Sequence, residues 1–253
     1  CFFSAKIALQ NEEWRKETLS SQLEQYKLLP SLKFGIESAL LQSLDPLQPA
    51  VLQASALLMG TPDEILSQAD AREADGYRSA KIKIGHLNKE DAKRLLHDLK
   101  NRFKLRVDVN RTWDRKESLN FFSSFEEDAF DYVEEPFKNP HELKYFTHPL
   151  AIDESYPSAL TLQDLENLPQ LKALIYKPTI QGGYFNALSL NDWALNRGIQ
   201  FILSSSFESN IGLYCVTLVA LRLSNKFPIG IGTVHFLDQN YKEAFDGQGK
   251  TKR

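Results

Sequence analysis

Five short hydrophobic runs of this 253-residue chain each end in a charged side chain. In chain order these residues are Lys83, Asp108, Glu134, Asp153 and Lys177. Successive members lie 19 to 26 residues apart, the length of one β-strand followed by one helix. Because charged residues at the strand ends of a parallel barrel face one mouth, the spacing predicts that three acids and at least two lysines converge on one site.

Side-chain alternation predicts which face of the first of these strands is polar. Lys81 and Lys83 lie two positions apart and therefore point to the same side, while Ala80, Ile82 and Ile84 occupy the other side. A pair of outward, solvated lysines is the alternative reading of this strand alone.

The next strand decides between these readings. Val107 and Val109 face one way, while Arg106, Asp108 and Asn110 face the other. Two neighbouring strands that each carry a polar face and a β-branched face predict a functional barrel mouth with the lysines inside.

Three converging carboxylates, those of Asp108, Glu134 and Asp153, need a cation. Unit charges about 4 Å apart repel by about 4 kcal/mol at an effective dielectric constant near 20. All-oxygen ligation without a nearby His or Cys favours Mg²⁺. The alternative for each acid taken singly is that it caps a loop or pairs with Lys or Arg.

Lys83 and Lys177 are expected to flank a substrate bound at such a metal. A lysine acts as a base near neutral pH only if its pKa falls from about 10.4, and nearby positive charge acts in that direction. A dication on a substrate carboxylate stabilises the charge left when the α-proton departs. The chemistry predicted is proton abstraction next to a carboxylate.

A repeating strand–helix pattern predicts an α/β fold of the (β/α)7β type, a TIM-like barrel, over residues 51–233. The expected strands are 51–58, 79–84, 104–110, 130–134, 149–153, 173–177, 199–204 and 227–232. The expected helices between them are 62–75, 89–103, 115–127, 159–165, 186–197 and 211–223. The connection after 130–134 is too short for a helix to be placed.

Residues 1–50 look helical, with Ser31 expected as the N-cap of a helix over 32–44. Because the chain starts at Cys1, we expect a missing upstream segment, and residues 234–253 are expected to form a tail. The net charge of −3 gives no reason to expect a nucleic-acid or membrane partner, and two cysteines fit a reducing cytoplasm. A small carboxylate is the expected partner, and the oligomeric state is not predicted.

Several motifs in order resemble the muconate-lactonizing subgroup of the enolase superfamily. They are Lys81-Ile82-Lys83, Asp108-Val109-Asn110, Glu134-Glu135-Pro136, Asp153-Glu154-Ser155 and Tyr176-Lys177-Pro178. Within it, the segments 177–183 and 204–212 resemble the o-succinylbenzoate synthase family, and 30–40 resembles its capping-domain helix. The resemblance implies a barrel with an N-terminal α+β capping domain, here truncated to the helical part in residues 1–50.

The resemblance also implies roles for individual residues. Asp108, Glu134 and Asp153 would be Mg²⁺ ligands, Lys83 the acid/base and Lys81 its electrostatic neighbour. Lys177 would stabilise an enediolate or stack on the substrate ring. The implied substrate-binding residues are Asn110, Gly182, Ser204, Ser206, Glu208 and Ser209.

The implied reaction is Mg²⁺-assisted dehydration of a succinyl-hydroxycyclohexadiene carboxylate, a step of menaquinone biosynthesis. Three alternatives stay open. An N-acylamino-acid racemase or dipeptide epimerase on the same scaffold would use the same lysines, Lys83 and Lys177. A Schiff-base aldolase would use a lysine on the sixth strand, and a barrel kept for binding or assembly would have no activity.

Overall fold

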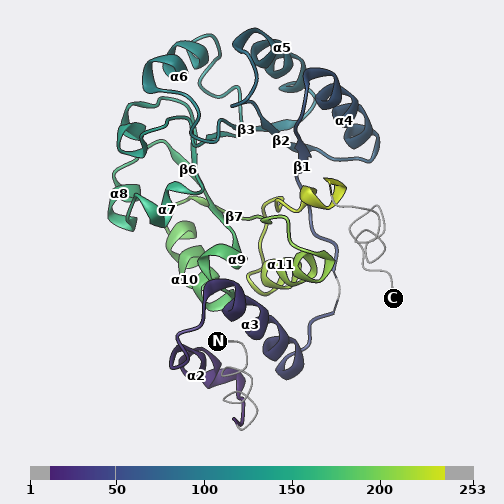
Figure 1. Ribbon diagram of the computed structural model, residues 1–253, viewed down its shortest axis with the longest axis vertical. Helices are drawn as coiled ribbons and strands as arrows, with labels where there is room; N and C mark the ends of the chain where they lie inside the picture. Colours follow the sequence, from purple (N-terminus) through teal and green to yellow (C-terminus); the bar gives the residue numbers. More distant parts are fainter. Residues whose placement is uncertain (1–11, 49, 237–253) are drawn as a thin grey trace.

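The computed structural model describes residues 12–48 and 50–236, in which a parallel sheet curls around a central space and helices surround it (Figure 1). Seven strands follow one another in chain order, and each pairs in parallel with the next. They are β1 (Ala56–Leu58), β2 (Ser79–Lys83), β3 (Lys104–Asp108), β4 (Tyr132–Glu134), β5 (Leu150–Ile152), β6 (Leu171–Tyr176) and β7 (Gln200–Leu203). The predicted barrel is confirmed.

The helices are α4 (Pro62–Ala74), α5 (Lys89–Leu99), α6 (Arg115–Phe122), α7 (Ser155–Ser158), α8 (Leu162–Glu166), α9 (Pro178–Gln181), α10 (Tyr184–Leu195) and α11 (Asn210–Arg222). The connection after β4, where no helix was expected, holds the 3-10 helix η2 (Pro140–Tyr145). The helix predicted over 159–165 is instead two short ones, α7 and α8, which flank a break at 159–161.

Two residues join the first and last edges of the sheet. The backbone N–H of Ser55 donates to the carbonyl of Ile229 at 2.9 Å, and Gly230 donates to the carbonyl of Leu203 at 2.8 Å. Bridges at Ile229 and Gly230 therefore connect the segment before β1 with the segment after β7. The barrel closes through this seam.

The eighth strand, predicted over 227–232, is the main correction to the sequence-based fold. Only two bridge residues form there, and the 3-10 helix η3 (Gly232–Phe236) follows at once. The seam is too tight for ordinary side chains. A Cβ on Gly230 would lie 2.7 Å from Oγ of Ser204, and one on Gly232 would lie 2.9 Å from Cβ of Leu57. The glycines thus permit the close approach of the two backbones. Glycine also weakens a strand, which agrees with the two bridge residues found here in place of a full strand.

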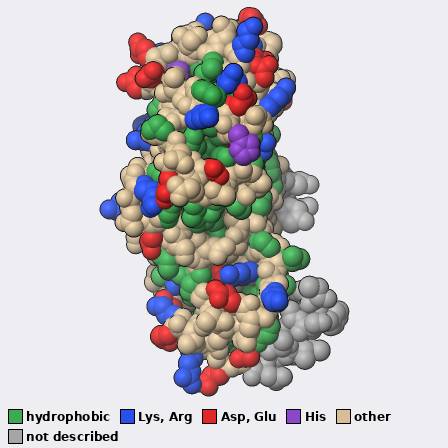
Figure 2. Space-filling view, turned by 90° about the vertical axis from the view of Figure 1, so that its left-hand side faces the viewer, with side chains coloured by type: hydrophobic (Ala, Val, Ile, Leu, Met, Phe, Trp, Pro, Cys, Tyr) green, Lys and Arg blue, Asp and Glu red, His purple; other side chains and the backbone are tan. Residues whose placement is uncertain are grey.

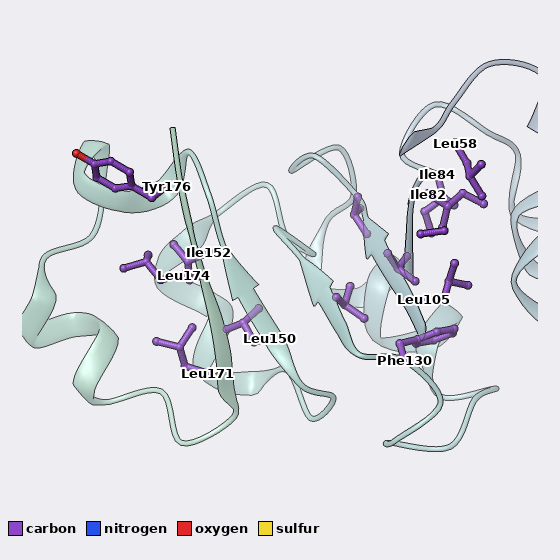
Figure 3. Packing of buried hydrophobic residues seen from close by; sticks show 14 of the residues in the cluster. Leu58, Ile82, Ile84, Leu105, Phe130, Leu150, Ile152, Leu171, Leu174 and Tyr176 are labelled. Carbon is purple, nitrogen blue, oxygen red and sulfur yellow. The ribbon is translucent and has the colours of Figure 1, made fainter. Parts of the chain in front are cut away.

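The faces of the strands follow the predicted alternation. The apolar side chains of β2 and β3 pack outward with the helices in one large cluster, and Leu58, Ile82 and Ile84 form one group in Figure 3. A smaller apolar cluster fills the inside of the barrel around Tyr132, Ile175 and Ile202. The inner face is therefore left for polar chemistry mainly on β2, β3 and β4.

The N-terminal part consists of η1 (Lys16–Thr18), α2 (Leu19–Glu24) and α3 (Pro30–Leu44). The prediction that Ser31 caps α3 is wrong, because the helix begins two residues earlier than expected, at Pro30, and Leu29 holds the N-cap position. Pro30 at the first helical position explains the shift, since proline suits that position and lacks the N–H that a cap would satisfy. α3 packs against α9, α10 and α11 of the barrel.

Charged side chains of both signs are interspersed on the face shown in Figure 2. Within residues 12–48 and 50–236, no helix combines the length and the apolar character required to span a bilayer. Residues 1–11 and most of the predicted tail, 237–253, lie outside the described residues. η3 runs across the predicted boundary between barrel and tail at residue 233.

Candidate active site

A cavity of about 280 Å³ lies at the strand ends inside the barrel. Its walls include Lys81 and Lys83 of β2, Glu134 at the end of β4 and Lys177 directly after β6. The remaining lining residues are Ser55, Ala56, Leu57, Arg106, Tyr132, Ile175, Ile180, Ile202, Ser204, Ser205, Ser206, Phe207, Gly230, Gly232 and Thr233. The charged strand ends therefore do share one mouth.

Strand register brings the predicted lysines and acids into contact. Lys83 is aligned with Asp108, and Asp108 with Glu134. Nζ of Lys81 lies 3.0 Å from Oδ2 of Asp108 and 2.7 Å from Oε1 of Glu134. Nζ of Lys83 lies 2.8 Å from the same oxygen of Asp108. The two lysines and two acids form one network, in which the acids are buried and the lysine side chains are 18% and 28% exposed.

On the other side of the cavity, Lys177 forms an ion pair with Asp153. Asp153 is held in turn by Glu135, which sequence reasoning left without a role. One carboxylate oxygen of Glu135 accepts the backbone N–H groups of Asp153 and Ser155, both at 2.9 Å, and the other accepts the Ser155 hydroxyl at 2.6 Å. Burial raises the pKa of Glu135 to about 7, and the charge of Glu154 adds to this. The second of the two consecutive acids before Pro136 was the sequence feature that could have pointed to this role.

The pKa values of the network's side chains shift in different directions. Burial by itself would lower the pKa of Lys81, but the charges of Asp108, Glu134 and Asp153 outweigh it and raise that pKa well above its usual value. Burial tends to raise the pKa of Asp108, yet Lys81 and Lys83 bring it down to about 2. Burial raises the pKa of Glu134 to about 8, with Lys81 opposing and the neighbouring acids adding to the rise.

The three acids offer a hard cation oxygen ligands only. The buried Oε2 of Glu134 has no hydrogen-bond partner among the described residues, so one ligand oxygen is uncommitted. The same part of the chain contains no group of three His, Cys, Asp or Glu side chains arranged to hold a metal ion as they stand. A lysine ammonium group lies against one oxygen of each acid and would have to withdraw, while the other oxygen of Asp108 accepts the backbone N–H of Asn110 at 2.9 Å. The donor chemistry fits Mg²⁺.

Of the residues predicted to bind substrate, some line the cavity or lie beside it, and others bond to the protein itself. Ser204 and Ser206 line the cavity. Asn110 lies beside it, with Oδ1 3.5 Å from Nζ of Lys83. The carbonyl of Gly182 accepts a hydrogen bond of 2.8 Å from the Tyr176 hydroxyl.

Glu208 and Ser209, also predicted to bind substrate, bond to the protein itself. One carboxylate oxygen of Glu208 accepts from the Thr179 hydroxyl, and the other accepts from the backbone N–H of Ser206 at 2.6 Å. Oγ of Ser209 caps α11 by accepting from the N–H of Gly212 at 3.4 Å. Direct contact of these two residues with substrate stays a prediction.

Sequence reasoning did not assign a role to Arg106, a buried arginine that lines the cavity. Its guanidinium lies 3.2 Å from Asp131, 2.8 Å from the carbonyl of Pro228 and 5.2 Å from the ring centre of Tyr132. The alternation on β3 placed Arg106 on the polar face, but its partners are Asp131 directly before β4, Tyr132 of β4 and Pro228 at the seam. Arg106 therefore links the cavity to the closure of the barrel.

A parallel barrel with lysines on both sides of buried acids at its strand ends defines an enolase-type barrel enzyme. The chain belongs to the enolase superfamily, because residues 64–248 match the family described as Enolase C-terminal domain-like. It is 30% identical over 242 residues to an o-succinylbenzoate synthase of Pasteurella multocida, an alignment that covers 90% of this chain and 71% of the relative.

Two solved structures show the same fold. A dipeptide epimerase from Enterococcus faecalis superposes with a TM-score of 0.70 at 20% identity, covering 88% of this chain and 72% of that one. A dipeptide epimerase from Methylococcus capsulatus, complexed with Mg and a dipeptide, superposes with a TM-score of 0.64 at 23% identity. This superposition covers 83% of this chain and 66% of that one. Family and relatives place the chain among enzymes, in the lyase class, and so set aside the non-catalytic alternative.

Proposed function

We propose that this protein is an o-succinylbenzoate synthase. It would dehydrate 2-succinyl-6-hydroxy-2,4-cyclohexadiene-1-carboxylate to o-succinylbenzoate, with release of water, as a cytoplasmic step of menaquinone biosynthesis. The observation that carries the proposal is the placement of Lys83 and Lys177 around one cavity, each paired with a buried acid. The Pasteurella multocida relative of that name supports the choice of reaction.

Asp108, Glu134 and Asp153 would hold Mg²⁺, which supplies a positive charge that stabilises the substrate carboxylate as its α-proton leaves. The Methylococcus capsulatus epimerase was solved with Mg, which supports the same cofactor here. All three acids are at least 95% buried, so their oxygens would be shielded from competing water: Asp108 is 2%, Glu134 1% and Asp153 5% exposed.

The structure favours Lys83 over Lys81 as the acid/base. Lys81 touches two carboxylates, and its strongly raised pKa keeps it protonated at neutral pH. Lys83 pairs with a single carboxylate, and its side chain is more exposed, 28% against 18%. Lys83 would take the α-proton and return a proton to the departing hydroxide, so that the lysine ends as it began.

Lys177 would act from the opposite side as a fixed positive charge. It lines the same cavity and lies against Asp153, while Lys83 lies against Asp108. A substrate with two carboxylates would therefore meet cationic groups from both sides. A fixed positive charge speeds the reaction where it lies next to the atoms on which negative charge develops.

A second carboxylate, on the succinyl arm, would bind at the cavity wall that Ser204 and Ser206 line. In the described part of the chain, the buried Oγ of Ser206 has no hydrogen-bond partner, although this residue lines the cavity. A free buried hydroxyl is costly unless a ligand satisfies it. Asn110, beside Lys83, would contact the ring carboxylate or support the metal shell.

Racemization of N-acylamino acids, or epimerization of dipeptides, is the second candidate function. It also requires a lysine on each side of the α-carbon, which the positions of Lys83 and Lys177 supply, and the Enterococcus faecalis epimerase shares the fold. Dehydration and proton exchange can be measured on the same protein. Metal-dependent aromatization of the cyclohexadiene supports the synthase, whereas α-proton exchange of N-acylamino acids in deuterated buffer without dehydration supports the epimerase.

A further inference from the structure

We propose that Glu208 is a positioning residue that ties the segment after β6 to the segment after β7. This inference rests on the proposed function, because it concerns how that active site is held in shape. Glu208 stands at the start of the turn that leads into α11, next to the exposed Phe207. It would act on catalysis through its neighbours and without touching substrate.

The tether consists of two hydrogen bonds to two different segments. Thr179, in α9 directly after β6, donates its hydroxyl proton to one carboxylate oxygen of Glu208. The backbone N–H of Ser206, directly after β7, donates to the other oxygen at 2.6 Å. Since each oxygen has a protein donor, neither is free to serve as the principal contact of a ligand.

The backbone around Glu208 is built to keep this side chain in place. Phe207 adopts a left-handed conformation with φ of 62°, which a bulky side chain rarely takes unless other contacts hold it there. The bond from Ser206 to Glu208 spans this residue. Gly212 makes room in the first turn of α11, because a Cβ at that position would lie 2.6 Å from Cβ of Glu208.

Both tethered segments carry cavity-lining residues. The segment after β6 contributes Lys177 and Ile180, and the segment after β7 contributes Ser206 and Phe207. Ile180 is 59% exposed and Phe207 52% exposed, so neither is fixed by burial in the core. Glu208 therefore provides a direct link between the side of the cavity with the second lysine and the side with the unpartnered hydroxyl.

Four variants of the full-length protein separate a tether from a charge that acts on substrate. Glu208→Ala removes both bonds, and Thr179→Val removes one while leaving the carboxylate intact. Glu208→Gln keeps both bonds, because the amide oxygen can accept from Ser206 and the amide nitrogen can donate to the Thr179 oxygen. Thr179→Ser keeps the hydroxyl and is the matched control for Thr179→Val.

We expect Glu208→Ala to lower kcat for dehydration by about 10- to 100-fold, since a misplacement of about 1 Å can cost about 100-fold. Thr179→Val should lower kcat in the same direction, while Glu208→Gln and Thr179→Ser stay within about threefold of wild type. Amide hydrogen exchange should speed up at 204–208 in Thr179→Val and at 177–181 in Glu208→Ala. In each case the faster exchange lies in the segment that does not carry the substitution, which shows that the tether connects the two segments.

Other results would overturn the proposal. If Glu208→Gln is as damaging as Glu208→Ala while Thr179→Val is normal, the charge of Glu208 acts directly. If exchange changes only in the segment that carries the substitution, no tether exists. Should the wild-type enzyme not dehydrate the cyclohexadiene, the proposed function fails, and the exchange experiment still decides the tether. Thr179→Val and Glu208→Gln keep the test valid if Glu208→Ala does not fold.

Discussion

Two walls of the cavity are built in different ways. The charged wall, defined as Lys81, Lys83, Asp108 and Glu134, comes from consecutive strands whose register places lysine beside acid. The seam wall, defined as Ser204–Ser206 together with Gly230, is formed where the barrel closes and depends on backbone contacts between distant segments. The charged wall contains the groups able to move a proton. The seam wall contains neutral hydroxyls that can hold a substrate.

Removing the acid/base from the charged wall should have the largest effect. Lys83→Ala is expected to lower kcat for dehydration by about 100- to 10,000-fold, the usual contribution of a general acid–base group. The fold should persist, because Ile82 and Ile84 supply the packing of that strand. Circular dichroism and single-turnover kinetics would test this, with the exposed Lys93→Ala as control. Substantial residual dehydration would remove Lys83 from this role.

Loss of a proposed metal ligand should come next. Glu134→Gln is expected to weaken Mg²⁺ binding by at least ~100-fold, since even loss of an outer-shell partner costs about 10- to 100-fold. Titration calorimetry with Mg²⁺ would measure the change directly. Unaltered Mg²⁺ affinity in this variant would place the metal elsewhere.

Substitutions in the seam wall should mainly change the free energy of unfolding. Gly230→Ala puts a Cβ 2.7 Å from Oγ of Ser204, so overpacking should lower the free energy of unfolding by about 1–3 kcal/mol. The same change at Gly35 of α3, where a Cβ would meet nothing within 4 Å, should raise it by about 0.5–1 kcal/mol. Urea unfolding of both variants gives the comparison, and equal effects would mean that the seam is not tight.

A smaller effect is expected at Ser206. Because its buried hydroxyl has no protein partner in the described chain, Ser206→Ala should not lower the stability of the ligand-free protein and should raise it slightly. It should raise KM by about fivefold, which corresponds to about 1 kcal/mol for one hydrogen bond to the substrate. Ser205→Ala is the matched control, since that hydroxyl bonds to the Gly230 carbonyl at 3.0 Å and should affect stability instead. A normal KM in Ser206→Ala would exclude this contact.

The smallest effect concerns Glu37, a buried acid of α3 outside both walls. Its Oε2 accepts the backbone N–H of Phe185 at 3.4 Å, and burial raises its pKa despite the opposing charge of Lys33. An acid whose pKa is raised on folding stabilises the folded state below its unfolded pKa, and this stability is lost as pH rises through the folded pKa. Stability should therefore decline above about pH 4.5, and Glu37→Gln should flatten that decline.

Urea unfolding at pH 5 and pH 7.5 would measure this difference in wild type and Glu37→Gln. Identical pH dependence in both proteins would show that Glu37 does not contribute to it. A pH-dependent contribution of Glu37 to the free energy of unfolding must be subtracted before any pH dependence of stability is assigned to the charged wall.

The charged wall followed from local patterns in the sequence, whereas Ser204 and Ser206 of the seam wall were predicted only through the family resemblance, and the difference has a physical reason. Alternation of side chains along a strand is a local property, so the sequence alone places Lys81 and Lys83 on one face and Asp108 on the matching face of the next strand. The contacts of Gly230 and the bonds of Glu208 join segments far apart in the chain, and no local pattern encodes them. Ser31 was misassigned because Ser and Pro compete for a helix start, and Pro30 took the first helical position.

We propose that the charged wall of this barrel performs metal-assisted dehydration, and one measurement tests this directly. The most direct measurement follows aromatization of the cyclohexadiene substrate in the ultraviolet with the full-length protein, in Mg²⁺ and in EDTA. We predict rapid product formation that stops when the metal is removed. A protein that binds Mg²⁺ but does not dehydrate the cyclohexadiene would not be a synthase, and the epimerase would then be the better candidate.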